Sequence, residues 1–303
     1  MSLGEWIVDI AGTPEGARLA VALALTSACA HALFGALQKA RHDPWVIRAA
    51  IDAALVLVSL PLALFLVPWP QGWEWLLLAG AMAVHLAYKL TMALAYSAAA
   101  YTVVYPVVRG TGPLVTVALA TVVFAESYAV LQWAGVGMLS GGILALALVN
   151  LNGTVRLDRP ALLVGLGWAL AGGVLVAVYT VYDAWAIRAM PDPFTFLAWF
   201  FLLTSLDFPI LLARRLAAAL RAPGGRALAL RGLIGALVAL VSFGGFILAT
   251  RVGPVGQAAV LRETSTVFAA LFGWLMLRER VGALRGGLMV LIAAGAVTVQ
   301  LAG

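Results

Sequence analysis

The sequence has few charged residues. Aspartate, glutamate, lysine and arginine make up 11% of the 303 residues, whereas 64% are hydrophobic. A soluble protein carries roughly 25% charged residues, so this chain lacks the polar side chains that a solvated surface requires. The mean hydropathy of +1.04 therefore indicates that the solvent for most of the chain is lipid.

Groups that bind metals are also scarce. The single cysteine, Cys29, provides neither a disulfide framework nor a thiolate metal site. The carboxylates are scattered without the His/Asp/Glu spacing of a metal site. We expect no metal and no cofactor, and a membrane-embedded enzyme acting on a lipid phosphate is the least favoured alternative. The protein is therefore not expected to be an enzyme.

The net charge of +6 does not indicate nucleic-acid binding, because the basic residues lie between apolar segments rather than on one face. No cleavable signal peptide is expected either. The first 15 residues contain three acidic residues and no basic one, which is opposite to the positive start of a signal.

Ten apolar segments are long enough to cross a bilayer, which takes about 20 residues each. The breaks at charged residues, proline and glycine place them at 18–38, 44–67, 73–95, 98–124, 130–149, 160–186, 194–213, 231–250, 254–277 and 281–301. They use nearly the whole chain and leave no room for a soluble domain. The sequence predicts an all-α integral membrane protein.

Two of these segments carry the same rare feature, an arginine inside the apolar stretch. Arg109 precedes Glu126 by 17 positions (126 − 109), and Arg262 precedes Glu279 by the same 17 (279 − 262). A charge at the bilayer centre costs at least about 2.5–3.5 kcal/mol. Two such charges at matching places in the fourth and ninth segments predict a five-helix repeat, residues 1–152 and 153–303.

The second and seventh segments support the repeat, because each opens on an Asp-Pro pair, Asp43-Pro44 and Asp192-Pro193. Five is an odd number, so the second half must enter the membrane from the opposite side. Such inverted repeats place a central site between two alternating conformations. Chance similarity between alanine-rich apolar segments is the alternative.

The loop charges predict the orientation. Loops on one side of the ten segments hold thirteen basic residues and the opposite side holds three, and basic loops stay in the cytoplasm. The thirteen are Lys39, Arg41, Arg48, Arg156, Arg159, Arg214, Arg215, Arg221, Arg226, Arg231, Arg278, Arg280 and Arg285; the three are Arg18, Arg188 and Arg251. We expect both termini outside the cytoplasm of a cell whose inner (plasma) membrane holds the protein.

Ionisable groups inside spans usually face the bundle interior or a wet cavity. Two guanidiniums approaching each other there, Arg109 and Arg262, would bind a carboxylate, phosphate or sulfonate. The alternative for Arg262 is a structural pair with Glu263. The set within or near the spans is Lys89, Arg109, Asp183, Arg262, Glu263, His31 and His85.

The fourth segment contains Pro106, Gly110, Gly112 and Pro113 within eight residues. A helix with missing backbone hydrogen bonds is tolerated in a membrane only where protein or a water-filled cavity provides partners for the free N–H and C=O groups. We therefore expect a broken helix and a substrate site at residues 105–113, including Tyr105. A simple proline kink is the competing interpretation.

Two polar patches are predicted on helices three and six. His85 and Lys89 are four residues apart and share one helical face, with Tyr88 beside them. His85 is a candidate proton carrier or a structural histidine. Asp183, near Tyr179, would hold an ammonium group or a coupling proton, or neutralise Lys89.

The remaining candidates are aromatic residues and glycines. Tyr101, Trp168 and Trp199 lie within the spans and either line a cavity or pack. The glycines at positions 135, 137, 141 and 142 indicate a face for close helix packing.

Together, Tyr105-Pro106-x-x-Arg109-Gly110-x-Gly112-Pro113 with Glu126, and Leu261-Arg262-Glu263-Thr264-Ser265 with Leu277-Arg278-Glu279-Arg280, resemble EamA-type members of the drug/metabolite transporter superfamily. The resemblance extends over the whole length. It implies ten helices around a central cavity that spans four and nine help to line. Relatives export amino acids and other metabolites, or carry sugar phosphates and quaternary amines, and many are drawn with cytoplasmic termini.

We therefore expect a secondary active transporter for a small anionic or zwitterionic metabolite, with amino acids favoured. Sugar-phosphate, other organic-anion and quaternary-amine carriage are the alternatives within the superfamily. The expected partners are the small-molecule substrate, the lipid bilayer and a coupling proton, and the protein would be a monomer or homodimer. The expected substrate-binding residues are Arg109, Arg262, Lys89, Tyr105, Tyr101, Tyr88, His85, Tyr179 and Trp168; those for coupling or charge pairing are Asp183, Glu263 and His31.

Overall fold

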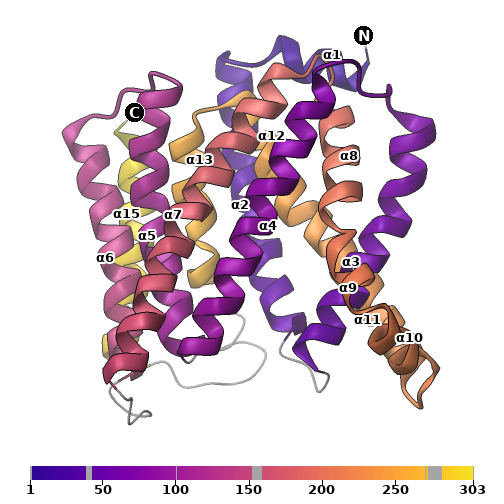
Figure 1. Cartoon of the computed structure of the whole chain (residues 1–303). Helices are drawn as coiled ribbons and strands as arrows, with labels where there is room; N and C mark the ends of the chain where they lie inside the picture. The colour runs from indigo at the N-terminus through magenta and orange to yellow at the C-terminus, as the bar shows by residue number, and fades with distance from the viewer. Residues whose placement is uncertain are drawn as a thin grey trace. The chain divides into compact units, whose positions relative to one another are not determined.

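The computed structural model describes residues 2–38, 43–99, 101–151, 159–269, 271 and 282–302. These residues form helices joined by short connections, and no strand occurs among them (Figure 1). Eight of the helices are long and apolar enough to cross a membrane, and Val130–Leu146 is a shorter apolar helix. The predicted helical membrane protein is thus confirmed. The full count of ten spans stays a prediction, because the last part of the segment 254–277 lies outside the described residues.

The chain divides into two compact units, and each draws helices from both halves of the sequence. The first unit comprises residues 1–82 and 184–252. Its helices are α1 (Leu3–Asp9), α2 (Pro14–Gln38), α3 (Pro44–Pro61), η1 (Leu62–Leu66), α8 (Pro193–Thr204), α9 (Asp207–Leu211), α10 (Ala213–Arg221), α11 (Gly225–Ala239), η2 (Leu240–Gly244) and α12 (Gly245–Val252).

The second unit comprises residues 83–183 and 253–303. It contains α5 (Tyr101–Val123), α6 (Val130–Leu151), α13 (Val255–Glu263) and α15 (Ala283–Leu301), with most of α4 (Glu74–Ala98) and of α7 (Arg159–Ala189). The helices α4 and α7 each continue from one unit into the other. The predicted repeat concerns the order of helices along the chain, and it stays a prediction.

Both Asp-Pro pairs begin helices, as predicted. Asp43 caps α3 by accepting a hydrogen bond from the Trp45 backbone N–H at 2.8 Å. Asp192 caps α8 by accepting from the Thr195 N–H at 2.7 Å. In each case the following proline occupies the first helical turn, where its missing N–H costs nothing.

The expected break in the fourth span is wrong, because α5 runs without interruption from Tyr101 to Val123 with both prolines inside it. Its glycines serve packing instead. A Cβ on Gly110 would lie 2.7 Å from the Leu144 side chain of α6, and one on Gly112 would lie 3.3 Å from Val176 of α7. Small residues allow such close approach of membrane helices.

Irregular backbone occurs in three other spans. The π-helical segments η1 and η2 interrupt the second and eighth spans, at Leu62–Leu66 after Pro61 and at Leu240–Gly244. The ninth span is interrupted where α13 ends at Glu263, because Thr264 forms a turn. The break therefore lies beside the second arginine of the repeat rather than beside the first.

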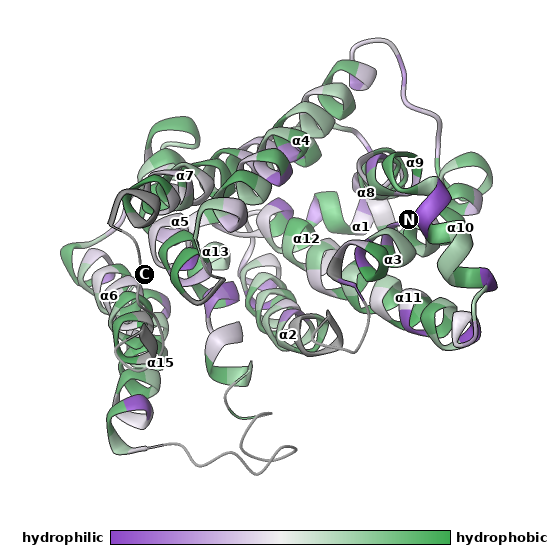
Figure 2. Ribbon diagram, turned by 60° about the horizontal axis from the view of Figure 1, so that its bottom comes forward, coloured by the Kyte–Doolittle hydropathy of each residue, from purple (hydrophilic) through white to green (hydrophobic). Residues whose placement is uncertain are grey.

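The helices α6 and α15 pack against each other at glycines (Figure 1). A Cβ added to Gly295 would lie 2.6 Å from the Gly135 carbonyl oxygen, and one on Gly142 would lie 2.8 Å from Ile292. Two of the four glycines predicted for close packing thus take part in it. Gly137 and Gly141 instead face open space. Figure 2 shows that hydrophobic residues dominate α6 and α15, as expected for helices whose other faces meet lipid.

Replacing Gly295 with alanine is expected to lower the thermal unfolding midpoint in detergent. The new methyl group would meet backbone atoms of α6, which cannot move aside cheaply, and overpacking costs about 1–3 kcal/mol. The matched control is Gly137→Ala on α6, where an added Cβ meets nothing within 4 Å. Equal midpoints for the two variants would show that the glycine contact does not hold α6 and α15 together.

Candidate functional site

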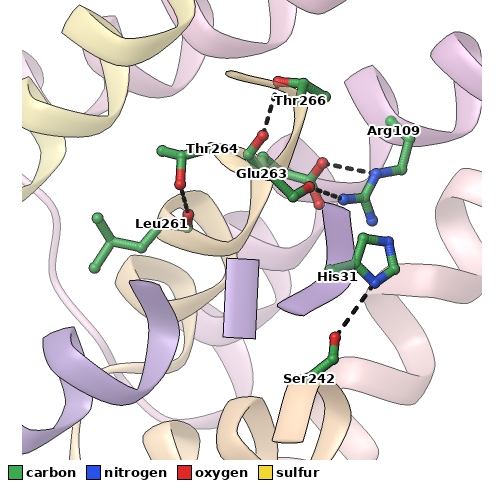
Figure 3. Close-up of polar contacts among 8 residues, drawn as sticks. His31, Arg109, Ser242, Leu261, Glu263, Thr264 and Thr266 are labelled. Atoms are coloured by element: carbon green, nitrogen blue, oxygen red, sulfur yellow. Dashed lines mark hydrogen bonds and ion pairs between the residues drawn. The ribbon is translucent and has the colours of Figure 1, made fainter. Parts of the chain in front are cut away.

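The site in the second unit is built around the buried Arg109 of α5, which is 7% exposed. Its Nε lies 2.9 Å from Oε2 of Glu263, and its Nη2 donates a hydrogen bond to Ser265 Oγ at 2.8 Å. Figure 3 shows the guanidinium directed at the Glu263 carboxylate. The arginine of the fourth span and the interrupted ninth span therefore meet through side chains.

The break after α13 presents Glu263 to Arg109. The Thr264 hydroxyl donates to the Leu261 carbonyl at 2.6 Å, and the Thr266 hydroxyl donates to the Glu263 carbonyl at 2.9 Å (Figure 3). These two bonds satisfy carbonyl groups that the end of a helix leaves without partners. A carboxylate at a helix C-terminus is electrostatically unfavourable, so a cation such as Arg109 is needed to hold Glu263 there.

Three tyrosines surround the two arginines. The Arg109 guanidinium carbon lies 5.8 Å from the centre of the Tyr105 ring, which is within the range of a cation–π contact. Arg262, which is buried, donates a hydrogen bond to the Tyr179 side chain of α7. The rings of Tyr88 and Tyr179 meet edge to face with centres 5.2 Å apart.

His85 of α4 and Asp183 of α7 form a second buried pair, with His85 Nε2 2.8 Å from Asp183 Oδ2. The His85 ring also lies 4.6 Å from the Tyr179 ring. Asp183 was expected to neutralise Lys89, and the structure pairs it with His85, one helical turn earlier on α4. Lys89 itself is half-buried.

These contacts join into one polar cluster, which we call the arginine cluster. It runs from Asp183 through His85, Tyr179 and Arg262 to Glu263 and Arg109. Its four buried charged side chains are two guanidiniums and two carboxylates, and so their formal charges balance. A ligand that fits here without upsetting the balance carries one group of each sign.

Two predicted site residues are not part of the arginine cluster, and the side chain of a third is not described. Trp168 is 38% exposed and precedes Asp183 by 15 residues (183 − 168), or about 22 Å along α7 at 1.5 Å per residue. His31 belongs to the first unit, where its Nδ1 lies 3.5 Å from Ser242 Oγ (Figure 3). Tyr101 begins α5, but its side chain lies outside the described residues.

Trp199 packs rather than lining the arginine cluster. It belongs to the first unit, where its ring meets Trp69 and Trp75 edge to face at 5.1 and 4.9 Å. Among the residues that the structure describes, no group of three His, Cys, Asp or Glu side chains could hold a metal ion.

Glu126 has a structural role that the sequence did not reveal. Its carboxylate accepts hydrogen bonds from the backbone N–H groups of Val255 at 2.7 Å and Gly256 at 3.2 Å, and from the Tyr128 hydroxyl. It thereby caps the N-terminus of α13, the helix that ends at Glu263. The 17-residue spacing singled out Glu126 but gave no indication of its partner. Glu279, its counterpart in the repeat, lies outside the described residues.

Replacing Glu126 with alanine is expected to destabilise the protein by about 0.5–2 kcal/mol, which is the typical value of a lost N-terminal cap. A lower unfolding midpoint would report the loss. The control is Glu74→Ala, which removes a half-buried glutamate that accepts from the Gln71 N–H at 2.8 Å. If the two variants unfold at the same temperature, the hydrogen bonds from α13 to Glu126 do not contribute the expected stability.

Comparison with known proteins finds one family whose model matches part of this sequence. Residues 163–301 match the model of the EamA-like transporter family. The EamA-like segment contains Tyr179, Asp183, Arg262 and Glu263, so four of the six residues of the arginine cluster lie inside it. The resemblance noted in the sequence is thereby confirmed for this segment.

The fold of the chain also has a counterpart among solved structures. A crystal structure described only as that of a protein aligns with a TM-score of 0.71 over 95% of this chain and 97% of its own length. The two sequences are 19% identical, so the likeness concerns the fold alone. No curated protein sequence matches the chain.

Proposed function

We propose that the protein is a secondary active transporter for a small zwitterionic or anionic metabolite, with an amino acid as the favoured substrate. Ten spans in two inverted five-helix repeats would provide alternating access. The observation that supports this substrate class is the charge balance of the arginine cluster. A zwitterion brings one positive and one negative group to two buried guanidiniums and two buried carboxylates.

Exchange of partners would bind the substrate. Arg109 Nε lies 2.9 Å from the Glu263 carboxylate, and a substrate carboxylate would take the place of Glu263 through charge-assisted hydrogen bonds. The Glu263 carboxylate would then be available to the substrate ammonium group. The cluster would thus contain a charged partner in both the empty and the loaded state, which avoids an uncompensated buried charge.

Coupling to a proton is proposed at the second pair. His85 and Asp183 share a hydrogen bond of 2.8 Å, and the His85 ring contacts Tyr179, which binds Arg262. Histidine changes charge near neutral pH when its environment is unperturbed. A proton on this pair would add positive charge beside Arg262 and so favour the substrate carboxylate.

The alternatives fit the cluster less well. A sugar phosphate or other dianion would require surplus positive charge, whereas the buried charges balance. A quaternary amine would require an aromatic cage with an unpaired carboxylate, whereas Glu263 pairs with Arg109 and Asp183 with His85. An enzyme acting on a lipid phosphate would require a metal or acid–base constellation, and transport fits the EamA-like segment better.

The proposed setting is the inner membrane, with both termini outside the cytoplasm because of the loop charges. We propose a monomer or a homodimer in the bilayer.

Thermal-shift measurements on the purified protein, followed by counterflow in proteoliposomes, test the substrate class. Amino acids should raise the unfolding midpoint, and analogues that lack either the amino or the carboxyl group should not. A shift of 2.7 kcal/mol in stability corresponds to ligand at about 100 times its Kd. Stabilisation and flux with sugar phosphates, and none with amino acids, would overturn the proposal.

A further inference from the structure

The first unit contains a cavity of about 950 Å³, and all the residues that line it belong to this unit. No arginine or lysine is among these lining residues. This volume is at the upper end of the roughly 300–1,000 Å³ typical of ligand sites. Its walls come from α1, α2, α3, η1, α8, η2 and α12. Most of the lining is apolar, with Leu23, Leu62, Phe201 and Leu248 among the contributing residues.

The cavity opens among helix ends that meet at one end of the unit. The Gly12 N–H donates to the Val252 carbonyl, which joins the start of α2 to the end of α12. The Thr195 hydroxyl donates to the Pro68 carbonyl, which joins the start of α8 to the residues after η1. At this end the lining includes the carboxylates Glu5 and Asp192.

The lining extends from these helix ends to about the depth of one membrane leaflet. Thr26 follows the start of α2 at Pro14 by 12 residues, and Leu240 precedes the end of α12 at Val252 by 12 residues. Twelve residues of helix span about 18 Å. Half of a hydrocarbon core of about 30 Å is about 15 Å, so the cavity has the length of a lipid acyl chain.

Two local features mark the cavity as a built site. Both π-helical segments line it, through Leu62 and Leu66 of η1 and Val241 of η2, and such segments are frequent at functional sites. Ser59, which also lines it, is fully buried, and its hydroxyl has no hydrogen-bond partner within the described part of the chain. A buried hydroxyl without a partner is costly, so a ligand oxygen at this point would relieve it.

The two carboxylates at the opening select the head group. Gly4 of α1 lies so close to Asp192 that an added Cβ would be 2.2 Å from the Asp192 Oδ1 atom, which brings Glu5 of the same helix to the start of α8. Each carboxylate also caps a helix, Glu5 through Ser2 and Asp192 through Thr195. Two negative charges at the level of the lipid head groups attract a cation and repel an anionic head group.

We propose that this cavity binds one phospholipid with an ammonium head group, of the phosphatidylethanolamine type. One acyl chain occupies the apolar cavity, and the ammonium group lies between Glu5 and Asp192. An ester oxygen accepts a hydrogen bond from the Ser59 hydroxyl. The lipid comes from the leaflet at the end of the unit that carries α1. It is a resident of the first unit and is distinct from any substrate of the arginine cluster in the second.

Native mass spectrometry of the full chain in detergent, with added phosphatidylethanolamine or phosphatidylglycerol, tests the acyl-chain site. The wild type should retain one phosphatidylethanolamine molecule and about tenfold less phosphatidylglycerol. The variant Gly245→Leu places a side chain in the cavity, since a Cβ there meets nothing closer than 3.6 Å, and should lose the lipid. The matched control Gly137→Leu, in open space on α6, should retain it.

The head-group preference is tested separately with the double variant Glu5→Gln and Asp192→Asn. Glutamine and asparagine keep the capping bonds, so the fold is retained while the two charges are removed. The preference for phosphatidylethanolamine should fall from about tenfold to near one, and Asp9→Asn, on the same helix but outside the lining, should leave it unchanged. Equal retention of both lipids by the wild type, or full retention of the lipid by Gly245→Leu, would overturn the proposal.

Discussion

Replacing Arg109 with methionine is expected to abolish transport and to lower stability by about 3–5 kcal/mol. The substitution leaves the Glu263 carboxylate, which is 5% exposed, without the guanidinium 2.9 Å away. An uncompensated buried charge carries a penalty of that size. Transport at substrate concentrations well below saturation should fall by about 30-fold or more, because truncation of a buried hydrogen-bonded charge costs at least about 2 kcal/mol of binding. Flux in proteoliposomes and thermal unfolding measure the two effects.

A second variant separates ligand contact from structural support. The double change Arg109→Met and Glu263→Met removes both charges, and apolar replacement of a buried ion pair is often neutral or stabilising. Stability should therefore return while transport stays absent. Recovery of flux in the double variant would make Arg109 a structural residue only. The matched control is Arg18→Met on α2, which removes an exposed arginine whose Nε donates to the Pro14 carbonyl at 3.3 Å, and it should leave both measurements unchanged.

The sequence predicted those features that local chemistry decides. An Asp-Pro pair provides both a side-chain acceptor and a residue suited to the first turn, so Asp43 and Asp192 could be placed at helix starts without tertiary information. The apolar length of the spans likewise indicated membrane helices. The arginines were recognised because a charge in an apolar stretch is rare, whatever it contacts.

Partners across the fold could not be predicted in the same way. Glu263 follows Arg262 directly, but successive residues on a helix point in different directions, and its partner is Arg109, 154 positions earlier (263 − 109). Asp183 finds His85 rather than Lys89 because one turn of α4 decides which side chain faces α7. The prolines of α5 predict a broken helix, whereas neighbouring helices can stabilise a proline-containing membrane helix.

The positions of irregular backbone were equally hidden. The segment η2 contains no proline, and Thr264, at the turn after α13, is neither glycine nor proline. The interruption after α13 is accompanied by local hydrogen bonds from the Thr264 and Thr266 hydroxyls to carbonyls at the end of this helix. The substrate site expected at residues 105–113 of α5 stays a prediction.

Replacing Glu263 with glutamine is expected to change which substrates the arginine cluster accepts. The amide keeps the shape of the side chain but removes one of the two buried carboxylates, which leaves Arg109 and Arg262 with a surplus of positive charge beside Asp183. A substrate ammonium group loses its partner, whereas a substrate carboxylate gains from the freed guanidinium. The preference for an amino acid over its analogue without the amino group should fall at least tenfold, since hydrogen bonds to charged groups contribute about 1.5–3 kcal/mol.

Competition of the two analogues in counterflow measures this ratio directly, and the ratio does not depend on how much protein is active. Glu126→Gln is the matched control, because it changes a second glutamate of the same unit whose carboxylate caps α13 rather than facing the arginines. It should lower stability and leave the ratio unchanged. An unchanged ratio in Glu263→Gln as well would mean that Glu263 only holds Arg109 in place, and the ammonium group of the substrate would then have to be bound at Asp183.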